Sequence, residues 1–176
     1  MTTAHAFAPT YHLWLKPSGE TLEVLSRAVR DLASTFGAPV FEPHVTLLTN
    51  LVGTEQEHVR RGGELARRLR PVPIVLVEPS TGPHYFQCVF LKVDPTPPVM
   101  SANMVAREIF SAPDEPYFPH LSLLYGLFPE ARKVAVVDGL SPTLLQTFEA
   151  QAVHLVRAHS TDPADWLEIG EFELAV

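Results

Sequence analysis

Two short motifs carry side chains suited to acid–base chemistry. Each places a histidine two residues before a hydroxyl residue: His44 before Thr46, and His120 before Ser122. Residues i and i+2 of a strand project from one face, so each imidazole would point together with its hydroxyl. Because histidine titrates near pH ~6.5, a pair can supply a neutral base and a protonated acid without a metal. Opening a cyclic phosphodiester needs such a pair, together with donors for the phosphoryl oxygens.

One such motif is a weak signal, but here it lies in an internal repeat. Residues 41–48 (FEPHVTLL) align without a gap with residues 117–124 (YFPHLSLL), and the proline, histidine, hydroxyl and leucine positions match. An expected strand and helix precede each motif, beginning at Tyr11 in one case and at Tyr85 in the other. The sequence therefore predicts two strand-helix-strand units. A pseudo-twofold relation between them would bring both motifs to one cleft.

The elements that position the motifs follow from periodicity and from the prolines that separate the apolar runs. Apolar residues recur at helical spacing up to Phe36, and Gly37 stands where a C-cap commonly falls. Thr54 and Glu57 form a capping-box signal for a second helix. Residues 72–77 and 85–93 predict a β-hairpin. We expect helices at about 22–36, 54–69, 97–109 and 129–137, and strands at about 11–16, 45–51, 72–77, 85–93, 120–125, 148–156 and 166–174.

Composition limits the class of protein. A chain of 176 residues with 46% hydrophobic residues can bury one core, so residues 1–176 are expected to form one domain with two lobes. The net charge of −7 opposes binding to polymeric nucleic acid, which needs many Lys or Arg contacts to phosphates. Residues 1–10 lack the pattern of a signal peptide, and no apolar run is long enough for a membrane span. We expect a cytoplasmic monomer that binds neither DNA nor membranes.

Other motifs point away from metals, cofactors and covalent catalysis. The sequence has no His-x-His, no cysteine pair, no HExxH and no Gly-rich phosphate loop, so we expect neither a metal nor a cofactor. Cys88 lies in an apolar strand and is expected to be a small buried residue. Solvated or core-edge roles are expected for the remaining histidines, which are His5, His12, His58, His84, His154 and His159.

Five arginines gather on the second expected helix. A solvated face held by salt bridges is the favoured interpretation, and contact with RNA or a second phosphate is the alternative. These arginines are Arg60, Arg61, Arg67, Arg68 and Arg70.

Longer strings than the two motifs support a family resemblance. YHLW at 11–14, YFQCVFL at 85–91 and PYFPHLSLLY at 116–125 resemble the 2H phosphoesterase superfamily, and most closely its plant- and yeast-type cyclic phosphodiesterases. The resemblance implies an α+β, bilobal fold, in which two pseudo-twofold-related lobes of antiparallel sheet with outer helices surround a central cleft. It also implies hydrolysis of ADP-ribose 1″,2″-cyclic phosphate or nucleoside 2′,3′-cyclic phosphates to the open monophosphates, so the expected partner is a small nucleotide cyclic phosphate.

The resemblance assigns site residues by position. It implies that His44 and His120 are the catalytic pair, and it leaves open which is the base and which the acid. It implies that the hydroxyls of Thr46 and Ser122 bind the phosphate. It also implies that Tyr125 is an aromatic residue of the cleft. Trp14 and Phe86 fall on expected strands that could line the same cleft, where they would stack on a base or ribose or belong to the core.

Two alternative functions use the same fold. One is an enzyme acting on RNA ends, as a 2′,3′-cyclic phosphodiesterase or a 2′-5′ RNA ligase. The other is a non-catalytic nucleotide-binding module, in which His44→Ala would leave function nearly unchanged.

Overall fold

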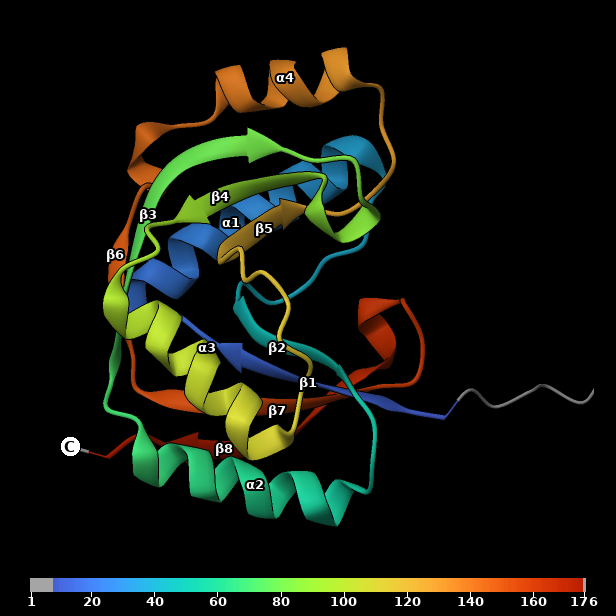
Figure 1. Cartoon of the computed structure of the whole chain (residues 1–176). Helices are drawn as coiled ribbons and strands as arrows, with labels where there is room; N and C mark the ends of the chain where they lie inside the picture. Colours follow the sequence, from blue (N-terminus) through green and yellow to red (C-terminus); the bar gives the residue numbers. More distant parts are fainter. Residues whose placement is uncertain (1–7, 176) are drawn as a thin grey trace, which may run out of the picture.

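The strands of the computed structural model, which describes residues 8–175, form one curled antiparallel sheet (Figure 1). Their order across the sheet is β6-β3-β4-β5-β2-β1-β7-β8. The two halves of this order meet at its centre, between β5 and β2. The strands are β1 (Thr10–Leu15), β2 (Val45–Leu51), β3 (Val72–Thr81), β4 (Val89–Val93), β5 (His120–Leu124), β6 (Thr147–Ala150), β7 (Ala152–Ala158) and β8 (Trp166–Glu173).

Two helix ends lie at the capping signals expected from the sequence, and α1 begins about three residues earlier than expected. Gly37 caps the first helix in the left-handed region, with φ of 63°. The hydroxyl of Thr54 accepts a hydrogen bond from the Glu57 amide and so caps the second. The helices are α1 (Gly19–Phe36), α2 (Glu55–Arg68), α3 (Pro97–Phe110) and α4 (Glu130–Gly139), with short 3-10 turns η1 (Tyr85–Gln87), η2 (Pro142–Leu144) and η3 (Pro163–Asp165).

The chain contains the two expected strand-helix-strand units, which are β1-α1-β2 and β4-α3-β5. Their register differs from the one predicted from the tyrosines. Trp14 pairs with Thr46 across β1 and β2, and Phe90 pairs with Ser122 across β4 and β5, with the same number of residues between the two partners. Trp14 is therefore equivalent to Phe90, and Tyr85 precedes the second unit, in η1.

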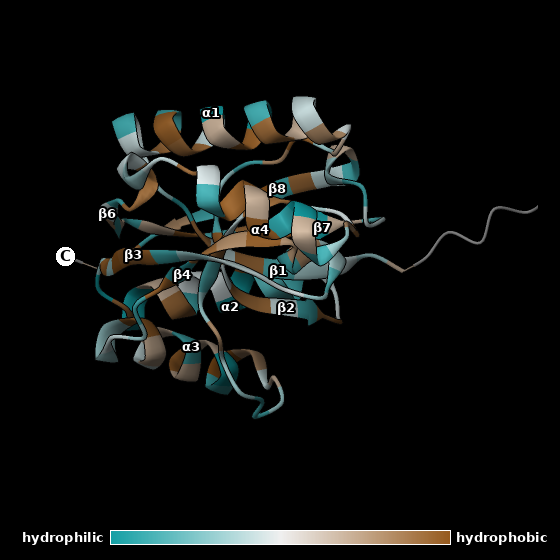
Figure 2. Ribbon diagram, turned by 90° about the horizontal axis from the view of Figure 1, so that it is seen from above, coloured by the Kyte–Doolittle hydropathy of each residue, from teal (hydrophilic) through white to brown (hydrophobic). Residues whose placement is uncertain are grey.

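The helices of the two units are exchanged across the sheet. Helix α1 of the first unit contacts β5 of the second, and α3 of the second unit contacts β2 of the first. Residues from both helices join one hydrophobic cluster with the strands, among them Leu25, Val29, Val99 and Ala106. In Figure 2, α1 and α3 lie on either side of the strands, and α1 alternates hydrophobic and hydrophilic bands, as an amphipathic helix should. The expected bilobal α+β fold is confirmed.

Two expected elements differ in detail. The expected strand at 85–93 begins only at Val89, because residues 85–87 form a 3-10 turn in the loop that connects β3 to β4. The expected strand at 148–156 is two strands separated at Gln151, since β6 pairs with β3 whereas β7 pairs with β1. Cys88 is buried, as expected. Within the described part of the chain, the helices are too short or too polar to cross a membrane.

Candidate active site

The central strands bring the two histidine motifs together. β2 and β5 pair antiparallel at Val45 and Leu121. By this register, His44 lies opposite Ser122 and Thr46 lies opposite His120, and all four side chains project from the same face of the sheet. The alternate residues Leu47 and Leu123 are buried in the core, as expected. The repeat therefore produces a compact group of two imidazoles and two hydroxyls.

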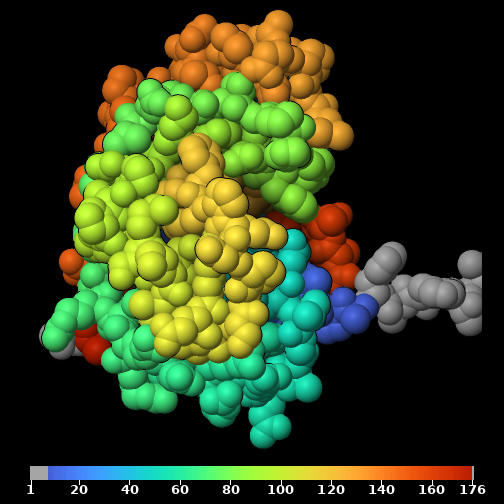
Figure 3. Space-filling view, viewed as in Figure 1, coloured from blue at the N-terminus to red at the C-terminus, as the bar shows by residue number. Residues whose placement is uncertain are grey.

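All four side chains line one cleft of about 900 Å³. Figure 3 shows that the surface is hollowed between the green segment that includes η1 and the red segment that includes η3. The lining residues come from β1, β2, β5 and η1, from residues next to these elements, and from the segment between the end of β7 and the start of β8. Besides the four motif residues they are Ala8, Thr10, His12, Trp14, Thr49, Asn50, His84, Phe86, Gln87, Tyr125, Ala158, His159, Ser160, Thr161 and Trp166.

The same backbone contact orients both imidazoles. The Nδ1 atom of His44 lies 2.7 Å from the Glu42 carbonyl oxygen, and Nδ1 of His120 lies 2.9 Å from the carbonyl oxygen of Phe118. A carbonyl oxygen only accepts hydrogen bonds, so Nδ1 carries the hydrogen in each ring. Nε2 is then the basic nitrogen of each neutral imidazole and the one left for a ligand. In the neutral state, both rings are therefore the same tautomer, with the hydrogen on Nδ1.

Aromatic rings hold the two histidines differently. The indole of Trp14 stacks on the His44 ring, with centroids 3.7 Å apart and planes 11° apart. At the equivalent position, Phe90 meets the His120 ring at 5.2 Å and 65°. His44 is buried, whereas His120 is half-buried. The His44 imidazole is therefore the more enclosed of the two.

Burial sets the protonation state of both histidines. It lowers the pKa of His44 to about 3, the bond to the Glu42 carbonyl acts in the opposite direction, and the positive charge of Lys16, or of His12 or His120 when either is protonated, lowers it further. Burial also lowers the pKa of His120, again opposed by its backbone carbonyl partner. Before an anion binds, both imidazoles are therefore mostly neutral at pH 7.

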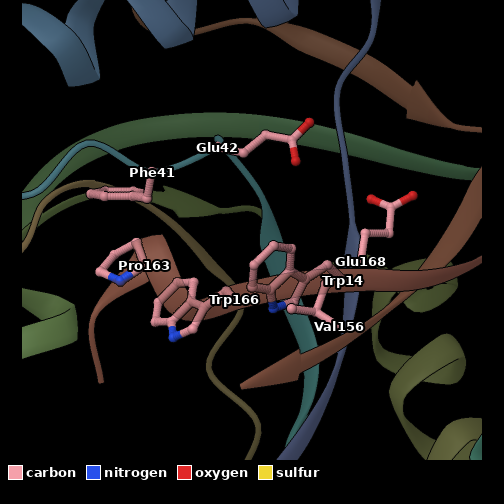
Figure 4. Close-up of a pocket in the computed structure, with 7 residues that line it drawn as sticks. All are labelled: Trp14, Phe41, Glu42, Val156, Pro163, Trp166 and Glu168. Carbon is pink, nitrogen blue, oxygen red and sulfur yellow. The ribbon is translucent and has the colours of Figure 1, made fainter. Parts of the chain in front are cut away.

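An ion-pair network lies beside the more enclosed histidine. The Lys16 ammonium binds the carboxylates of Glu42, at 3.0 Å, and Glu168, at 2.5 Å, and Glu168 also lies 3.2 Å from Nδ1 of His154. Figure 4 shows both carboxylates on one side of the Trp14 indole, around a small second cavity. Glu42 connects this network to His44, because its carboxylate binds Lys16 and its backbone carbonyl oxygen contacts Nδ1 of His44.

The two hydroxyls have different partners. Ser122 is buried, and its Oγ donates to the Phe86 carbonyl oxygen over 2.8 Å. The Thr46 hydroxyl has no hydrogen-bond partner among residues 8–175, although the Thr46 carbonyl accepts from the Tyr117 hydroxyl at 3.0 Å. Only Thr46 can thus donate to a ligand without first breaking a bond within the protein.

The three predicted aromatic residues all line the cleft, but one lies on a different element. Tyr125 directly follows β5 and stacks on Phe41 at 3.7 Å, and Trp14 lies on β1 as expected. The prediction that Phe86 lies on a strand is wrong, because it belongs to η1. The turn places the Phe86 ring so that its centroid lies 5.1 Å from the centroid of the Tyr125 ring.

Several cleft residues were not predicted. His12 lies two residues before Trp14 on β1, so the strand alternation that placed Trp14 at the cleft also places His12 there. Its Nδ1 lies 2.8 Å from the Thr49 hydroxyl. Trp166 comes from the start of β8, and its ring lies 5.7 Å from Trp14 and 5.9 Å from Phe86. No local sequence signal connects Trp166 with either motif.

Solvated or core-edge positions were expected for the remaining histidines, and this expectation is wrong for some of them. His58 is fully buried, because its ring packs between Tyr11 and Phe110. His154 is buried against Glu168. Three others, His12, His84 and His159, line the cleft. His5 lies outside the described residues.

The arginine-rich helix is held within the protein. Arg61 binds Glu57 at 2.6 Å and the Phe110 carbonyl, and Arg68 binds Glu108 at 2.9 Å. Arg60 pairs with Glu64 in the same helix. No residue of α2 is among the described residues that line the cleft. The salt-bridged interpretation of this helix is confirmed for these three arginines.

One group of side chains outside the cleft has the composition of a metal site. His154, Glu168 and Glu171 each offer a ligand atom, and these atoms lie within 4.8 Å of one another. Glu168 already binds the Lys16 ammonium, which balances its charge. The ion-pair network therefore explains this cluster.

Solved structures define the class of fold. LigT of E. coli, in a crystal structure complexed with 3′-AMP, has a TM-score of 0.68 at 13% identity, over 96% of this chain and all of LigT (100%). TT0787 of Thermus thermophilus has a TM-score of 0.64 at 19% identity, over 94% of this chain and 97% of that protein. The curled sheet with its four helices is a 2H phosphoesterase fold.

Sequence comparisons define the family within that class. The model of the cyclic phosphodiesterase-like protein family matches residues 10–173, and the chain belongs to this family. A cyclic phosphodiesterase of Arabidopsis thaliana is 34% identical over 124 residues, which are 70% of this chain and 68% of the relative. A 2′,3′-cyclic-nucleotide 3′-phosphodiesterase of Kluyveromyces lactis is 29% identical over 64% of this chain and 62% of its own length. The expected resemblance is confirmed, and with it the expectation of an enzyme of the cyclic phosphodiesterase type.

Proposed function

We propose that this protein hydrolyses the cyclic phosphate of small nucleotides, nucleoside 2′,3′-cyclic phosphates or ADP-ribose 1″,2″-cyclic phosphate, by acid–base catalysis with two histidines. The observation that carries the proposal is the antiparallel register at Val45 and Leu121, which sets His44 and His120 on one face of the sheet beside Thr46 and Ser122. The name of the Arabidopsis relative supports a cyclic phosphodiester as the substrate, and that of the Kluyveromyces relative supports a 2′,3′-cyclic nucleotide.

His44 acts as the general base in this proposal. Its ring is buried under Trp14, and burial together with the charge of Lys16 opposes its protonation, so its Nε2 stays available to accept a proton. Nε2 takes a proton from water as the water oxygen attacks phosphorus. In its unprotonated form the imidazole can accept the proton of the attacking water at neutral pH.

His120 acts as the general acid. It is the more exposed of the two imidazoles, and a bound phosphate anion raises its pKa through the attraction between opposite charges. Its Nε2–H donates the proton to the departing sugar oxygen as the bond from phosphorus to that oxygen breaks. The products are a free sugar hydroxyl and a phosphomonoester, so atoms and charge balance.

The two hydroxyls bind the non-bridging phosphoryl oxygens. Thr46 is free to donate, whereas Ser122 must first turn its hydrogen away from the Phe86 carbonyl. Removal of one such donor costs about 2–4 kcal/mol of transition-state stabilisation by analogy with oxyanion donors. Because the cleft walls, as far as residues 8–175 form them, contain neither Lys nor Arg, these hydroxyls and the protonated imidazole carry most of the phosphate recognition.

An RNA end and a non-catalytic binding role remain the competing functions. Two observations weigh against an RNA-binding site formed by the arginines of α2. Arg61 and Arg68 are held in ion pairs, and no residue of α2 lines the described part of the cleft. The matched placement of Nε2 on both imidazoles weighs against simple binding, because binding alone does not require two bases with the same tautomer.

The test is hydrolysis of a panel of nucleoside 2′,3′-cyclic phosphates and ADP-ribose 1″,2″-cyclic phosphate, with chelator present and the products identified. Turnover of at least one compound is expected, and an oligonucleotide ending in a cyclic phosphate tests the RNA alternative. Binding of every compound without turnover would contradict the proposal and support the binding module.

A further inference from the structure

The cleft extends in two opposite directions from the histidine pair. Since Thr46 lies opposite His120 and the two central strands are antiparallel, β2 continues past this pair toward Asn50 while β5 continues the other way toward Tyr125. Both Asn50 and Tyr125 line the same cleft. The motifs thus stand between two ends of a long site.

The two ends differ in chemistry. Tyr125, Phe86 and Trp166 form an aromatic wall at one end, with ring centroids 5.1–6.1 Å apart. The other end, called the polar end here, is lined by side chains that hydrogen-bond without a formal charge. Its residues are Thr10, His12, Thr49 and Asn50.

A strand irregularity builds the polar end. Tyr11 pairs with Leu51 but Leu13 pairs with Leu48, so β2 has one residue more than β1 in this stretch. This bulge contains Asn50, which has a φ of 55°, a conformation that costs energy for a residue other than glycine. Bulges of this kind re-aim side chains next to active sites. The first unit has this bulge and the second has no counterpart, because β5 ends at Leu124.

Two side chains of the polar end are arranged to meet a ligand. The Thr49 hydroxyl contacts Nδ1 of His12 at 2.8 Å, while the other ring nitrogen lies 3.3 Å from the Thr10 hydroxyl. Both hydroxyl oxygens keep further hydrogen-bonding capacity. The side-chain amide of Asn50 is exposed and has no hydrogen-bond partner among residues 8–175. It offers both a donor and an acceptor.

Charge decides what kind of group fits there. None of the residues found to line the cleft within 8–175 is Lys, Arg, Asp or Glu. Burial lowers the pKa of His12 to about 4, so its ring is neutral at pH 7. A wall of this kind suits the neutral edges of a base or ribose better than a further phosphate, which would need a cation. Thr49 lies three residues after Thr46 along β2, which is about 10 Å of extended strand.

We propose that the polar end is a second nucleoside subsite, which binds the part of a dinucleotide-sized substrate that does not carry the cyclic phosphate. This inference rests on the proposed function. Two sources would present the same chemistry: the adenosine of ADP-ribose 1″,2″-cyclic phosphate, joined through a diphosphate, and the preceding nucleoside of a dinucleotide that ends in a 2′,3′-cyclic phosphate.

The experiment compares kcat/KM for these two compounds with kcat/KM for adenosine 2′,3′-cyclic phosphate. The wild type should prefer at least one extended compound by about tenfold or more, the gain expected from about 1.4 kcal/mol of added binding. The preferred compound identifies the source. Thr49→Val and Asn50→Gly should each reduce this ratio severalfold, and glycine tolerates the backbone of Asn50. Because the polar end has no cation among residues 8–175, the ratio should not change with salt.

Val52→Ala is the matched control, since Val52 is 82% exposed and does not line the cleft. The ratio should be unchanged in this variant. A wild-type ratio near one, or a preference that survives both Thr49→Val and Asn50→Gly, would overturn the subsite. If no compound is hydrolysed, the proposed function fails. The subsite is then tested by calorimetry, as the ratio of the affinity for each extended compound to the affinity for adenosine 2′,3′-cyclic phosphate in the wild type and the same variants.

Discussion

The Ser122 hydroxyl donates its hydrogen to the backbone carbonyl of Phe86 across 2.8 Å. A second bond, from the Gly126 amide to the Tyr85 carbonyl at 2.9 Å, holds the same turn. Thr46, the equivalent residue of the first motif, makes no such bond to a neighbouring turn within residues 8–175. The second motif thus positions an aromatic wall of the cleft in addition to presenting a hydroxyl.

This relationship predicts energetic coupling between Ser122 and Phe86. Ser122→Ala removes a phosphate donor and also loosens the turn that carries the Phe86 ring. In a double-mutant cycle on kcat/KM for adenosine 2′,3′-cyclic phosphate, Ser122→Ala and Phe86→Ala should depart from additivity by about 0.5 kcal/mol or more. Each hydroxyl deletion alone should lower kcat/KM by roughly 10²–10³.

Thr46→Ala supplies the control for this cycle. Combined with Phe86→Ala, its effect should be additive within about 0.5 kcal/mol, because Thr46 does not touch the turn. Amide hydrogen exchange at residues 85–87 should accelerate in Ser122→Ala and not in Thr46→Ala. Equal coupling in both cycles would show that Ser122 does not position the turn.

The charge of Lys16 should add to the effect of burial in keeping His44 unprotonated. Lys16→Met removes a positive charge and leaves the carboxylates of Glu42 and Glu168 unneutralised, and both changes favour the imidazolium. The pKa of His44, followed by NMR titration of its ring protons, should therefore rise. If His44 is the base, kcat/KM at pH 5 should fall relative to its value at pH 7.5 by more than in the wild type.

Lys92 provides the matched comparison, because it lies opposite His120 as Lys16 lies near His44, and it binds Glu78. Lys92→Met should leave the titration of His44 at its wild-type position. A His44 titration that is unaffected by Lys16→Met would contradict the electrostatic role given to the network.

His58 should make the fold less stable in acid. Both of its ring nitrogens are buried without a hydrogen-bond partner among residues 8–175, and burial lowers the pKa of His58 below 6.5. Between the folded pKa and 6.5 the unfolded chain binds more protons, so this contribution to stability is lost as the pH falls below 6.5. His58→Leu should raise the free energy of unfolding at pH 5 by about 1–2 kcal/mol.

Denaturant unfolding at pH 5 and pH 7.5 measures this effect. The gain from His58→Leu should be larger at pH 5 than at pH 7.5, whereas His84→Leu, at an exposed position, should produce no such difference. A gain that is the same at both pH values would mean that protonation of His58 does not destabilise the fold.

The sequence allowed the motif residues and most elements to be predicted, because their signals are local. Strand alternation placed His44 with Thr46 and Leu47 on the opposite face, and the repeat implied that a second copy would meet the first. The Gly37 cap and the Thr54 cap marked helix ends correctly. These features depend on spacing within one element.

Features that depend on distant contacts were missed. The tyrosines at 11 and 85 suggested a register for the repeat, but Tyr85 lies in η1, a turn held by bonds to Ser122 and Gly126 that sequence spacing does not encode. Trp166 reaches the cleft because β8 pairs with β7, which pairs with β1. His12 could have been found, since it shares a strand face with Trp14.

The central claim is that His44 and His120 together catalyse hydrolysis of a cyclic phosphate, and the most direct measurement is kcat/KM for adenosine 2′,3′-cyclic phosphate with chelator present. His44→Ala and His120→Ala, each shown by circular dichroism to be folded, should each lose roughly 10²–10⁴ of the wild-type value. Either variant retaining activity within tenfold of the wild type would contradict the two-histidine mechanism.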